Sequence, residues 1–195
     1  ECKMIYTITL NPALDYIIKL KELVPNEINT SESEYILTGG KGINVSIILK
    51  RLEVESVTLG FISGFTGKEI QKLVEKEKIQ TDFINQEEGH SRINVKILED
   101  EKETAINSKG PLVDNKSIEK LYQKLSNLKE NDILVLSGSI PKGIKEEIYE
   151  EICEKIKDKN VKIVVDSTKK LLLNTLKYRP FLIKPNHHEL GEIFN

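Results

Sequence analysis

The sequence predicts an α/β protein in which helices cover a parallel β-sheet and a small antiparallel β-sheet forms a lid over the mouth of that sheet. Two observations predict the main sheet: apolar runs with the length of strands recur along the chain, and charged segments with helical spacing separate most of them. This alternation is typical of βαβ units. A third observation predicts the lid, because two segments interrupt the alternation and one of them has apolar residues at every second position.

The elements of the main sheet can be assigned in order along the chain. The apolar runs that we interpret as strands end near Leu10, Ile62, Leu136, Val165 and Ile183. Apolar residues recur at helical intervals, which predicts helices over Gly42–Leu52, Gly67–Lys78, Asn115–Leu128, Lys145–Lys157 and Lys169–Leu176. Each predicted helix is amphipathic, as a helix that covers a sheet should be. A last helix is expected to begin within 186–195, so that the chain ends inside a structural unit.

The predicted lid consists of Tyr16–Leu37 and Ser91–Ile106. In the second segment Ile93, Val95 and Ile97 alternate with polar residues, as in a half-exposed strand. The apolar face of such a thin sheet is too exposed for a single layer. We therefore expect it to bury against a partner lid or to close over a ligand.

Composition excludes several classes of partner. The 29 basic and 31 acidic residues nearly cancel, so no global field favours nucleic acid or an anionic membrane surface, and anion binding must be local. No apolar run reaches the ~20 residues that span a bilayer, and the start lacks the apolar stretch of a signal peptide. The two cysteines, Cys2 and Cys153, match no metal-ligand spacing, which predicts reduced thiols in a cytoplasmic protein.

A glycine-rich segment, Thr38–Ser46, leads directly into the first predicted helix. Glycines at such a position let a ligand approach the backbone, and the free amides of a helix N-terminus attract anions or sugar oxygens. The segment is not a Walker A loop, because the GxxxxGK[ST] pattern is absent. An ordinary turn between a loop and a helix is the alternative interpretation.

Two further segments follow predicted strands at the edge where open α/β sheets bind ligands. Asp15 lies in a predicted turn after the first strand, where a carboxylate can accept hydrogen bonds from two sugar hydroxyls, although a turn-forming aspartate is an equal contender. Ser137–Gly143 offers small residues and hydroxyls near a helix start, which suits a phosphate or sugar pocket. The alternative is a plain turn with an N-cap serine.

Charged residues near the lid and at the last strands complete the set of candidates. Arg92 and Lys109 lie at the edges of the predicted lid strands and can meet a phosphate, or can be solvated surface charges. Asp166 and Glu189 follow neighbouring strands, and their carboxylates can hold a hydrated Mg²⁺ through water. Helix capping by Asp166 and Asn186 is the competing explanation.

Five segments, taken together, carry a resemblance to a known family. They are, in this order, Asn11–Asp15 (NPALD), Gly39–Val45 (GGKGINV), Ser91–Ile97 (SRINVKI), Ser137–Gly143 (SGSIPKG) and Lys184–Leu190 (KPNHHEL). Each segment is unspecific alone, whereas the ordered set resembles the PfkB or ribokinase-type carbohydrate kinases. Within that family it is most similar to the 1-phosphofructokinases and their relatives the tagatose-6-phosphate kinases.

The resemblance implies a Rossmann-like αβα sandwich over residues 4–195, with lid segments at about 16–37 and 91–106 that often form a dimer contact. It also implies ATP-dependent phosphorylation with Mg²⁺. The residues implied to bind the sugar phosphate are Asp15, Gly39, Gly40, Lys41, Asn44, Arg92, Ser139 and, less directly, Lys109. The residues implied to face ATP phosphates and the metal ion are Lys184, Asn186, Glu189 and Asp166.

One part of the family pattern is missing from the sequence. The resemblance implies a GAGD-type segment that supplies the general base, and we expect this segment beyond Asn195. The leading hypothesis is therefore the larger part of a kinase that converts fructose 1-phosphate and ATP to fructose 1,6-bisphosphate and ADP, inactive as this segment alone. Arg92–Ile97 favours fructose 1-phosphate over tagatose 6-phosphate. A shortened, non-catalytic sugar-phosphate-binding protein is the rival hypothesis, and the absence of GxGxxG after the first strand argues against a dinucleotide enzyme.

Overall fold

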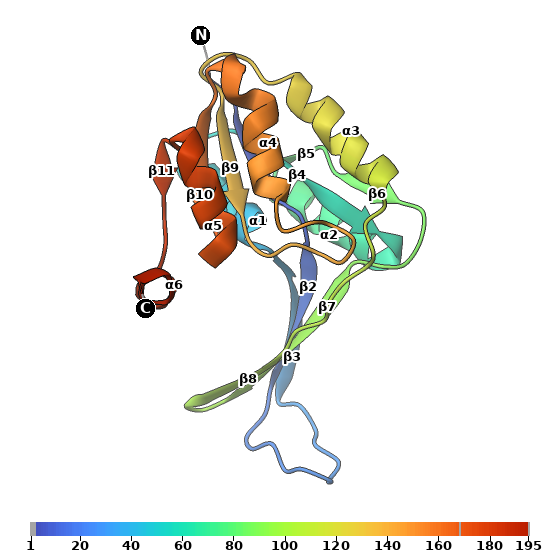
Figure 1. Cartoon of the computed structure of the whole chain (residues 1–195). Coiled ribbons are helices and arrows are strands. Elements are labelled where there is room, and N and C mark those ends of the chain that lie inside the picture. Colours follow the sequence, from blue (N-terminus) through green and yellow to red (C-terminus); the bar gives the residue numbers. More distant parts are fainter. Residues whose placement is uncertain (1–2, 168, 195) are drawn as a thin grey trace.

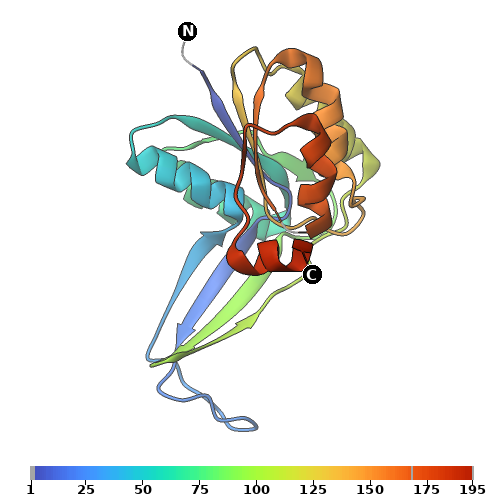
Figure 2. The same ribbon diagram turned by 60° about the vertical axis from the view of Figure 1, so that its left-hand side comes forward.

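A computed structural model describes residues 3–167 and 169–194 and contains two β-sheets (Figure 1). The larger sheet is covered by helices, and the smaller one extends from it as a long arm (Figure 2). The arrangement confirms the predicted α/β fold with a second, smaller sheet, for which we keep the name lid.

All strand pairs recorded in the main sheet of the described chain are parallel. The order is β11-β10-β9-β1-β4-β5, and β6 pairs with β4. The strands are β1 (Ile5–Thr9), β4 (Ser56–Ser63), β5 (Gln80–Thr81), β6 (Ile84–Gln86), β9 (Ile133–Ser137), β10 (Lys162–Asp166) and β11 (Leu182–Ile183). Each predicted strand end lies within one residue of the observed end. The carboxyl ends of β1, β9 and β10 therefore meet at one edge, where the predicted site segments begin.

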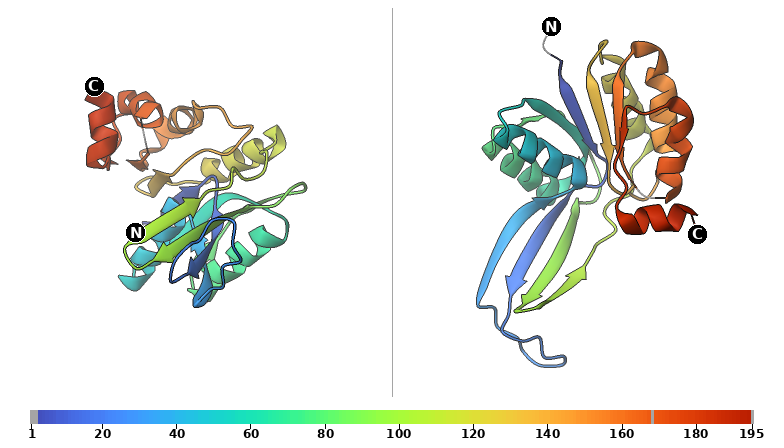
Figure 3. Two further views of the ribbon diagram at one scale, coloured as in Figure 1. Left: turned by 90° about the horizontal axis from the view of Figure 1, so that it is seen from below. Right: turned by 90° about the vertical axis from the view of Figure 1, so that its left-hand side faces the viewer.

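Helices cover both faces of the main sheet (Figure 3). On one face lie α1 (Lys41–Arg51) and α2 (Gly64–Lys76); on the other lie α3 (Asn115–Ser126), α4 (Ile148–Ile156) and α5 (Lys169–Thr175). Short 3₁₀ turns, Lys157–Lys159 and Leu176–Tyr178, follow α4 and α5, and α6 (His187–Phe194) follows β11. Two apolar clusters fill the layers, one beneath α3 and α4 and one beneath α1 and α2.

Two helices begin at residues other than those predicted. Helix α2 begins three residues earlier, at Gly64, directly after β4. Helix α4 begins at Ile148 rather than Lys145. The segment before α4 is held in a non-helical connection, because the amide of Val113 donates to the Lys142 carbonyl and Ile144 is buried in the core. These tertiary contacts leave no signal in the helical periodicity.

The lid is a mixed sheet rather than the antiparallel sheet predicted from the sequence. Its order is β3 (Ser33–Gly39), β2 (Ala13–Lys19), β7 (Arg92–Glu99) and β8 (Lys102–Ile106). The outer pairs are antiparallel, whereas β2 and β7 are parallel. Parallel pairing needs a long crossover connection, and the chain supplies one because α1, β4 and α2 lie between the two strands.

The two faces of the lid differ in chemistry. Paired residues share a face, so Asp15, Asn94 and Lys96 lie on one side of β2 and β7. A row of apolar residues crosses the other side from strand to strand: Ile36, Tyr16, Val95 and Ile106. The outer members of this row are about half exposed. The face with Asp15 also carries the exposed Tyr35 and Leu37, so it is mixed, whereas the row on the other face is apolar.

The described residues bear on two expectations drawn from composition. Cys153 is a buried free thiol, and burial raises its pKa to about 12, so the thiol stays protonated. Cys2 lies outside the described residues. Among the helices that the structure describes, none has the length and apolar character needed to cross a membrane.

Candidate active site

A pocket of about 250 Å³ lies at the carboxyl edge of the main sheet, beside the first residue of β7. Four predicted site residues line it: Gly40, Lys41, Arg92 and Ser139. Four further residues also line it: Thr9 and Ser167, which lie outside the segments that the sequence analysis named, and Asn11 and Gly138, which lie in those segments but were not predicted as site residues. The pocket joins segments that are far apart in the chain.

The N-terminus of α1 forms one wall of the pocket. Its N-cap, Gly40, has no side chain and adopts a φ of 137°, which favours glycine. The missing cap is supplied by Thr9, whose hydroxyl accepts a hydrogen bond of 3.0 Å from the amide of Ile43. In the described chain no hydrogen bond satisfies the amides of Lys41 and Gly42. The helix therefore presents two free N–H groups at its positive end, which suits an anion.

Helix α1 packs closely against the sheet at Gly42. A Cβ atom at Gly42 would lie 2.6 Å from the Ile8 carbonyl oxygen, so only glycine fits there. One turn later the buried Ser46 hydroxyl shares a hydrogen bond of 2.8 Å with Thr7 and accepts one of 3.0 Å from Ser56. We call Thr7, Ser46 and Ser56 the hydroxyl seam. It fixes the rotation of α1 on the sheet, and nothing in the local sequence pattern indicates it.

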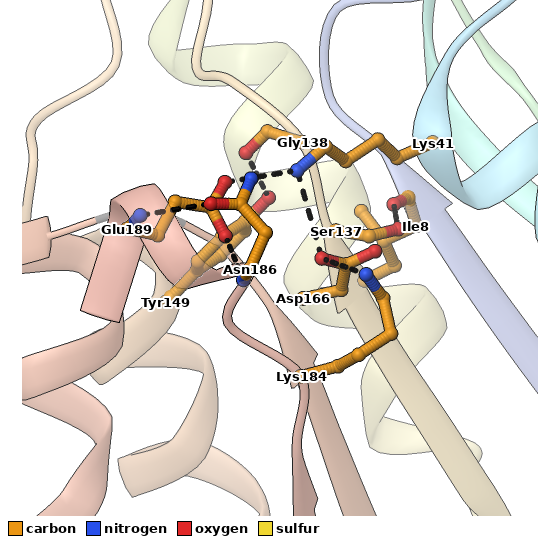
Figure 4. A network of polar contacts seen from close by, with 9 residues as sticks. All are labelled: Ile8, Lys41, Ser137, Gly138, Tyr149, Asp166, Lys184, Asn186 and Glu189. Atoms are coloured by element: carbon orange, nitrogen blue, oxygen red, sulfur yellow. Dashed lines mark hydrogen bonds and ion pairs between the residues drawn. The ribbon is translucent and has the colours of Figure 1, made fainter. Parts of the chain in front are cut away.

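The side chain of Lys41 lies between two buried carboxylates (Figure 4). Its Nζ atom is 3.5 Å from Asp166 Oδ1 and 3.5 Å from Glu189 Oε1, and Lys184 Nζ is 3.2 Å from the same Asp166 oxygen. These distances exceed the ~2.7–2.9 Å of a charge-assisted hydrogen bond. Asp166 Oδ1 makes no hydrogen bond within the described residues. The two lysines and the two carboxylates thus form ion pairs that are longer than hydrogen bonds. Each group can therefore still form a hydrogen bond to a ligand.

Helix α6 begins with a reciprocal capping box. The amide of Asn186 donates to Glu189 Oε2 at 2.9 Å, and the amide of Glu189 donates to Asn186 Oδ1 at 2.8 Å. The hydrogen bond from Asn186, followed by the nearby charge of Lys41, holds the pKa of Glu189 below its ordinary value. Asn186 is therefore a helix cap, as the competing interpretation held, while Glu189 caps the helix with one oxygen and faces Lys41 with the other.

Asp15 lies inside strand β2, and its predicted position in a turn after the first strand is wrong. Strand β1 ends at Thr9, and the chain re-enters the sheet conformation at Ala13, so Asp15 lies on the lid. Asn94 donates a hydrogen bond of 2.8 Å to Asp15, and Lys96 Nζ lies 3.0 Å from its other oxygen. Gly39 leaves room for this carboxylate, since a Cβ there would lie 2.5 Å from Asp15 Oδ1.

Arg92 connects the lid to the pocket. Its Nε donates to the Asn11 carbonyl at 3.0 Å, and burial lowers the pKa of its guanidinium while the charge of Asp15 raises it. Of the predicted sugar-phosphate residues, Asp15, Gly39, Asn44 and Lys109 do not line the pocket, and neither do the four residues predicted to face ATP and the metal ion. Lys109 has an exposed side chain and contributes only its carbonyl, which accepts from Asn11, and the exposed Asn44 lies beyond the pocket wall.

The loop after β9 forms the remaining wall. The amide of Gly138 donates to the Asp166 carbonyl at 3.2 Å, which ties the ends of β9 and β10 together. Ser139 and Ser167 add hydroxyls to the lining. The Ser167 hydroxyl is buried and has no hydrogen-bond partner in the described chain, as expected of a group that meets a ligand.

The pocket thus offers cations, free amides and hydroxyls, which are the groups that bind a phosphorylated sugar. The family model for pfkB family carbohydrate kinases matches residues 8–195. The chain belongs to the pfkB family of carbohydrate kinases. This membership confirms the predicted family and accounts for the ordered set of sequence motifs.

Individual members of the pfkB family are similar to the chain in sequence and in fold. The chain is 44% identical to 1-phosphofructokinase from Bacillus subtilis and 38% identical to D-tagatose-1-phosphate kinase from Bacillus licheniformis, over 98% of its own length in both cases. It spans 62% of the length of each of these relatives. A crystal structure of phosphofructokinase-2 from Escherichia coli in complex with fructose-6-phosphate superposes with a TM-score of 0.92, over 99% of this chain and 64% of that one. At 24% identity that likeness shows the fold alone.

Proposed function

We propose that the chain is the sugar-phosphate-binding part of a kinase that transfers the γ-phosphoryl group of ATP to fructose 1-phosphate. The observation that carries this proposal is the pocket in which Lys41, Arg92 and the free amides of α1 converge. In the reaction the 6-hydroxyl oxygen forms a bond to the γ-phosphorus, the bond to the bridging oxygen of ADP breaks, and the hydroxyl proton passes to a base. The products are fructose 1,6-bisphosphate and ADP.

The sugar phosphate is proposed to bind across the pocket and the lid. Lys41 and Arg92 supply positive charge, and the α1 amides supply N–H donors for the phosphate oxygens. Asp15, held in place by Asn94 and Lys96, can accept hydrogen bonds from sugar hydroxyls. The Ser139 hydroxyl is available from the opposite wall.

The carboxylates beside Lys41 have the chemistry to serve the phosphate donor and its Mg²⁺. Mg²⁺ prefers oxygen ligands and often keeps several waters when phosphates complete its shell. Asp166 fits this role because its buried Oδ1 makes no hydrogen bond, and Glu189 keeps Oε1 directed away from its capping bonds. The described residues contain no cluster of three or more metal-binding side chains, so the protein would hold the ion together with ATP phosphates. A bound Mg²⁺ would neutralise phosphate charge, while Lys184 would pair with phosphate oxygens.

The catalytic base is proposed to come from outside the 195 residues. Among the described carboxylates near the pocket, Asp15 is bound by Asn94 and Lys96, whereas Asp166 and Glu189 face lysines. A base must be free to take the proton of the acceptor hydroxyl, and none of these groups is placed for that task. The relatives are longer than this chain, which leaves room for the missing residue.

A second copy of the protein is the proposed partner of the lid. The apolar row Ile36, Tyr16, Val95 and Ile106 has exposed members on a thin sheet. Burying this row against the lid of another protomer would remove apolar surface from water.

The test is a substrate panel on the complete gene product with ATP and Mg²⁺. The acceptors are fructose 1-phosphate, D-tagatose 1-phosphate, tagatose 6-phosphate and fructose. We expect the highest kcat/KM for fructose 1-phosphate. D-tagatose 1-phosphate is the second candidate acceptor because of the relative at 38% identity, and a higher kcat/KM for it would replace the assignment. Tight binding without turnover of any acceptor would favour a non-catalytic sugar-phosphate-binding protein.

A further inference from the structure

Tyr149 is a core residue whose polar end reaches the wall of the pocket. It lies in the first turn of α4, its side chain is fully buried, and its ring belongs to the apolar cluster beneath α3 and α4. Its hydroxyl donates a hydrogen bond of 3.1 Å to the carbonyl of Gly138 (Figure 4). Tyr149 itself does not line the pocket. Any effect on a ligand must therefore pass through Gly138.

Gly138 is held on both sides. Its amide donates to the Asp166 carbonyl at 3.2 Å, and its carbonyl accepts from Tyr149. The two hydrogen bonds orient the peptide planes before and after this residue. In the described chain no other hydrogen bond to Gly138 constrains the second plane, so its direction depends on the Tyr149 hydroxyl.

The second plane also contains the amide of Ser139. The described chain contains no cis peptide, and in a trans peptide the C=O and N–H groups point in opposite directions. A Gly138 carbonyl directed toward the core therefore directs the Ser139 N–H away from the core. Within the described residues no hydrogen bond uses this amide, and Ser139 lines the pocket.

We propose that Tyr149 is a positioning residue that, through Gly138, presents the Ser139 amide to a phosphate oxygen of the bound sugar phosphate. The inference rests on the proposed function for the identity of the ligand. It assigns a role to the hydroxyl of Tyr149 that is separate from the packing of its ring. A free amide fixed in direction binds an anionic oxygen better than one that must first be ordered, because the ordering has no further entropic cost.

The substitution Tyr149→Phe removes the hydroxyl and keeps the ring. Tyr122→Phe is the matched control, because Tyr122 is a partly buried tyrosine on α3 whose hydroxyl donates to Glu151 at 2.5 Å, outside the pocket. Both variants lose one tyrosine hydrogen bond in the layer formed by α3 and α4. Only the first loses a bond to the pocket wall.

Two measurements on the complete gene product test the inference. Calorimetric titration with fructose 1-phosphate should give a dissociation constant roughly three- to tenfold higher for Tyr149→Phe than for the wild type, the effect of one hydrogen bond. Hydrogen exchange of the peptide that contains 138–140 should be faster in Tyr149→Phe. Tyr122→Phe should match the wild type in both measurements.

The outcomes separate this inference from the proposed function. If the wild type binds fructose 1-phosphate and Tyr149→Phe binds it equally well, the positioning role is overturned. An equal loss of affinity in Tyr122→Phe would also overturn it, because the loss would then reflect general destabilisation. If the wild type does not bind fructose 1-phosphate, the proposed function fails, and unchanged exchange at 138–140 in Tyr149→Phe would overturn the positioning of the Ser139 amide independently.

Discussion

The hydroxyl of Thr9 on β1 caps helix α1 by accepting a hydrogen bond from Ile43, 34 residues further along the chain. This bond takes the place of the side-chain cap that Gly40 cannot provide. It leaves the amides of Lys41 and Gly42 free at the pocket. The anion-binding end of α1 is thus organised by a residue of the neighbouring strand.

Thr9→Val keeps the shape of the side chain and removes the acceptor. We expect about 1 kcal/mol lower stability, the usual cost of a lost cap, and a several-fold higher KM for fructose 1-phosphate. Thr9→Ser retains the hydroxyl and should recover most of the affinity. Urea unfolding and steady-state kinetics provide the measurements, and equal KM values for the Val and Ser variants would contradict the capping role.

Replacing Arg92 with methionine should weaken the use of the phosphorylated sugar. A charge-assisted contact to phosphate contributes ~1.5–3 kcal/mol, so KM for fructose 1-phosphate should rise by about tenfold or more. Turnover of free fructose should change much less, since it lacks the phosphate. Lys68→Met, which removes an exposed cation on α2, is the control. If fructose turnover fell as far as fructose 1-phosphate turnover, Arg92 would not be a phosphate ligand.

The stability contributed by Glu189 should depend on pH in a defined direction. The pKa of Glu189 is lowered in the folded state, mainly by the hydrogen bond from the Asn186 amide. Folding therefore favours the ionised form of Glu189. Its contribution is present above the ordinary glutamate pKa of ~4.3 and is lost as pH falls through the lower pKa of the folded state.

Glu189→Gln isolates this contribution, because glutamine can still complete the capping box. The difference in unfolding free energy between wild type and variant should be largest near pH 7 and should shrink in acid. Glu119→Gln, at an exposed carboxylate on α3, is the matched control. A difference that stayed constant from pH 7 into strong acid would rule out the ionised form of Glu189 as its source.

The polypeptide Glu1–Asn195 by itself should have no kinase activity. Losing a positioned general base typically costs ~10²–10⁴-fold in rate, and the carboxylates near the described pocket are engaged elsewhere. The assay compares this polypeptide with the complete gene product, using ATP, Mg²⁺ and fructose 1-phosphate. Activity within tenfold of the complete protein would place the base inside these residues, and the site would need a new assignment.

The apolar row of the lid should support self-association. Ile36→Lys introduces a charge on β3 within this row, and we expect it to shift the complete protein toward monomer in sedimentation. Leu52→Lys, at a more exposed apolar position after α1, should leave the association unchanged. A monomeric wild type at high concentration would remove the lid as a dimer contact.

Local sequence patterns were sufficient for five strands of the main sheet, but not for the short β5 and β6 or for the pairing within the lid. Strand ends such as Leu136 and Ile183 are visible as apolar runs followed by polar residues. The parallel pairing of β2 with β7 depends on a crossover through α1, β4 and α2, and no period within either strand encodes it. The start of α4 also differs from the prediction because of a tertiary contact: Ile144 is buried in the core, and the local pattern does not encode this burial.

The candidate site was predictable where a residue acts through its own local motif. Gly40, Lys41, Arg92 and Ser139 lie in segments with a recognisable pattern, and the structure brings them to one pocket. Thr9 was missed because its role exists only through a contact with α1, made by a strand residue whose sequence context is unremarkable. A side chain that binds a backbone group far away in the sequence can be identified only from the folded structure.

The hydroxyl seam between α1 and the sheet has a consequence for how the protein tolerates change. An apolar interface permits a helix to settle in several rotations, whereas Ser46 meets Thr7 and Ser56 in only one, and a shift by one residue would turn the helix by about 100°. Buried hydrogen bonds add little net stability, about 1 kcal/mol each, so apolar replacements in the seam need not weaken the fold. They would remove the constraint on rotation instead. A variant can therefore unfold at the wild-type temperature and still aim Lys41 in the wrong direction, so thermal stability alone is a poor guide to whether this site is intact.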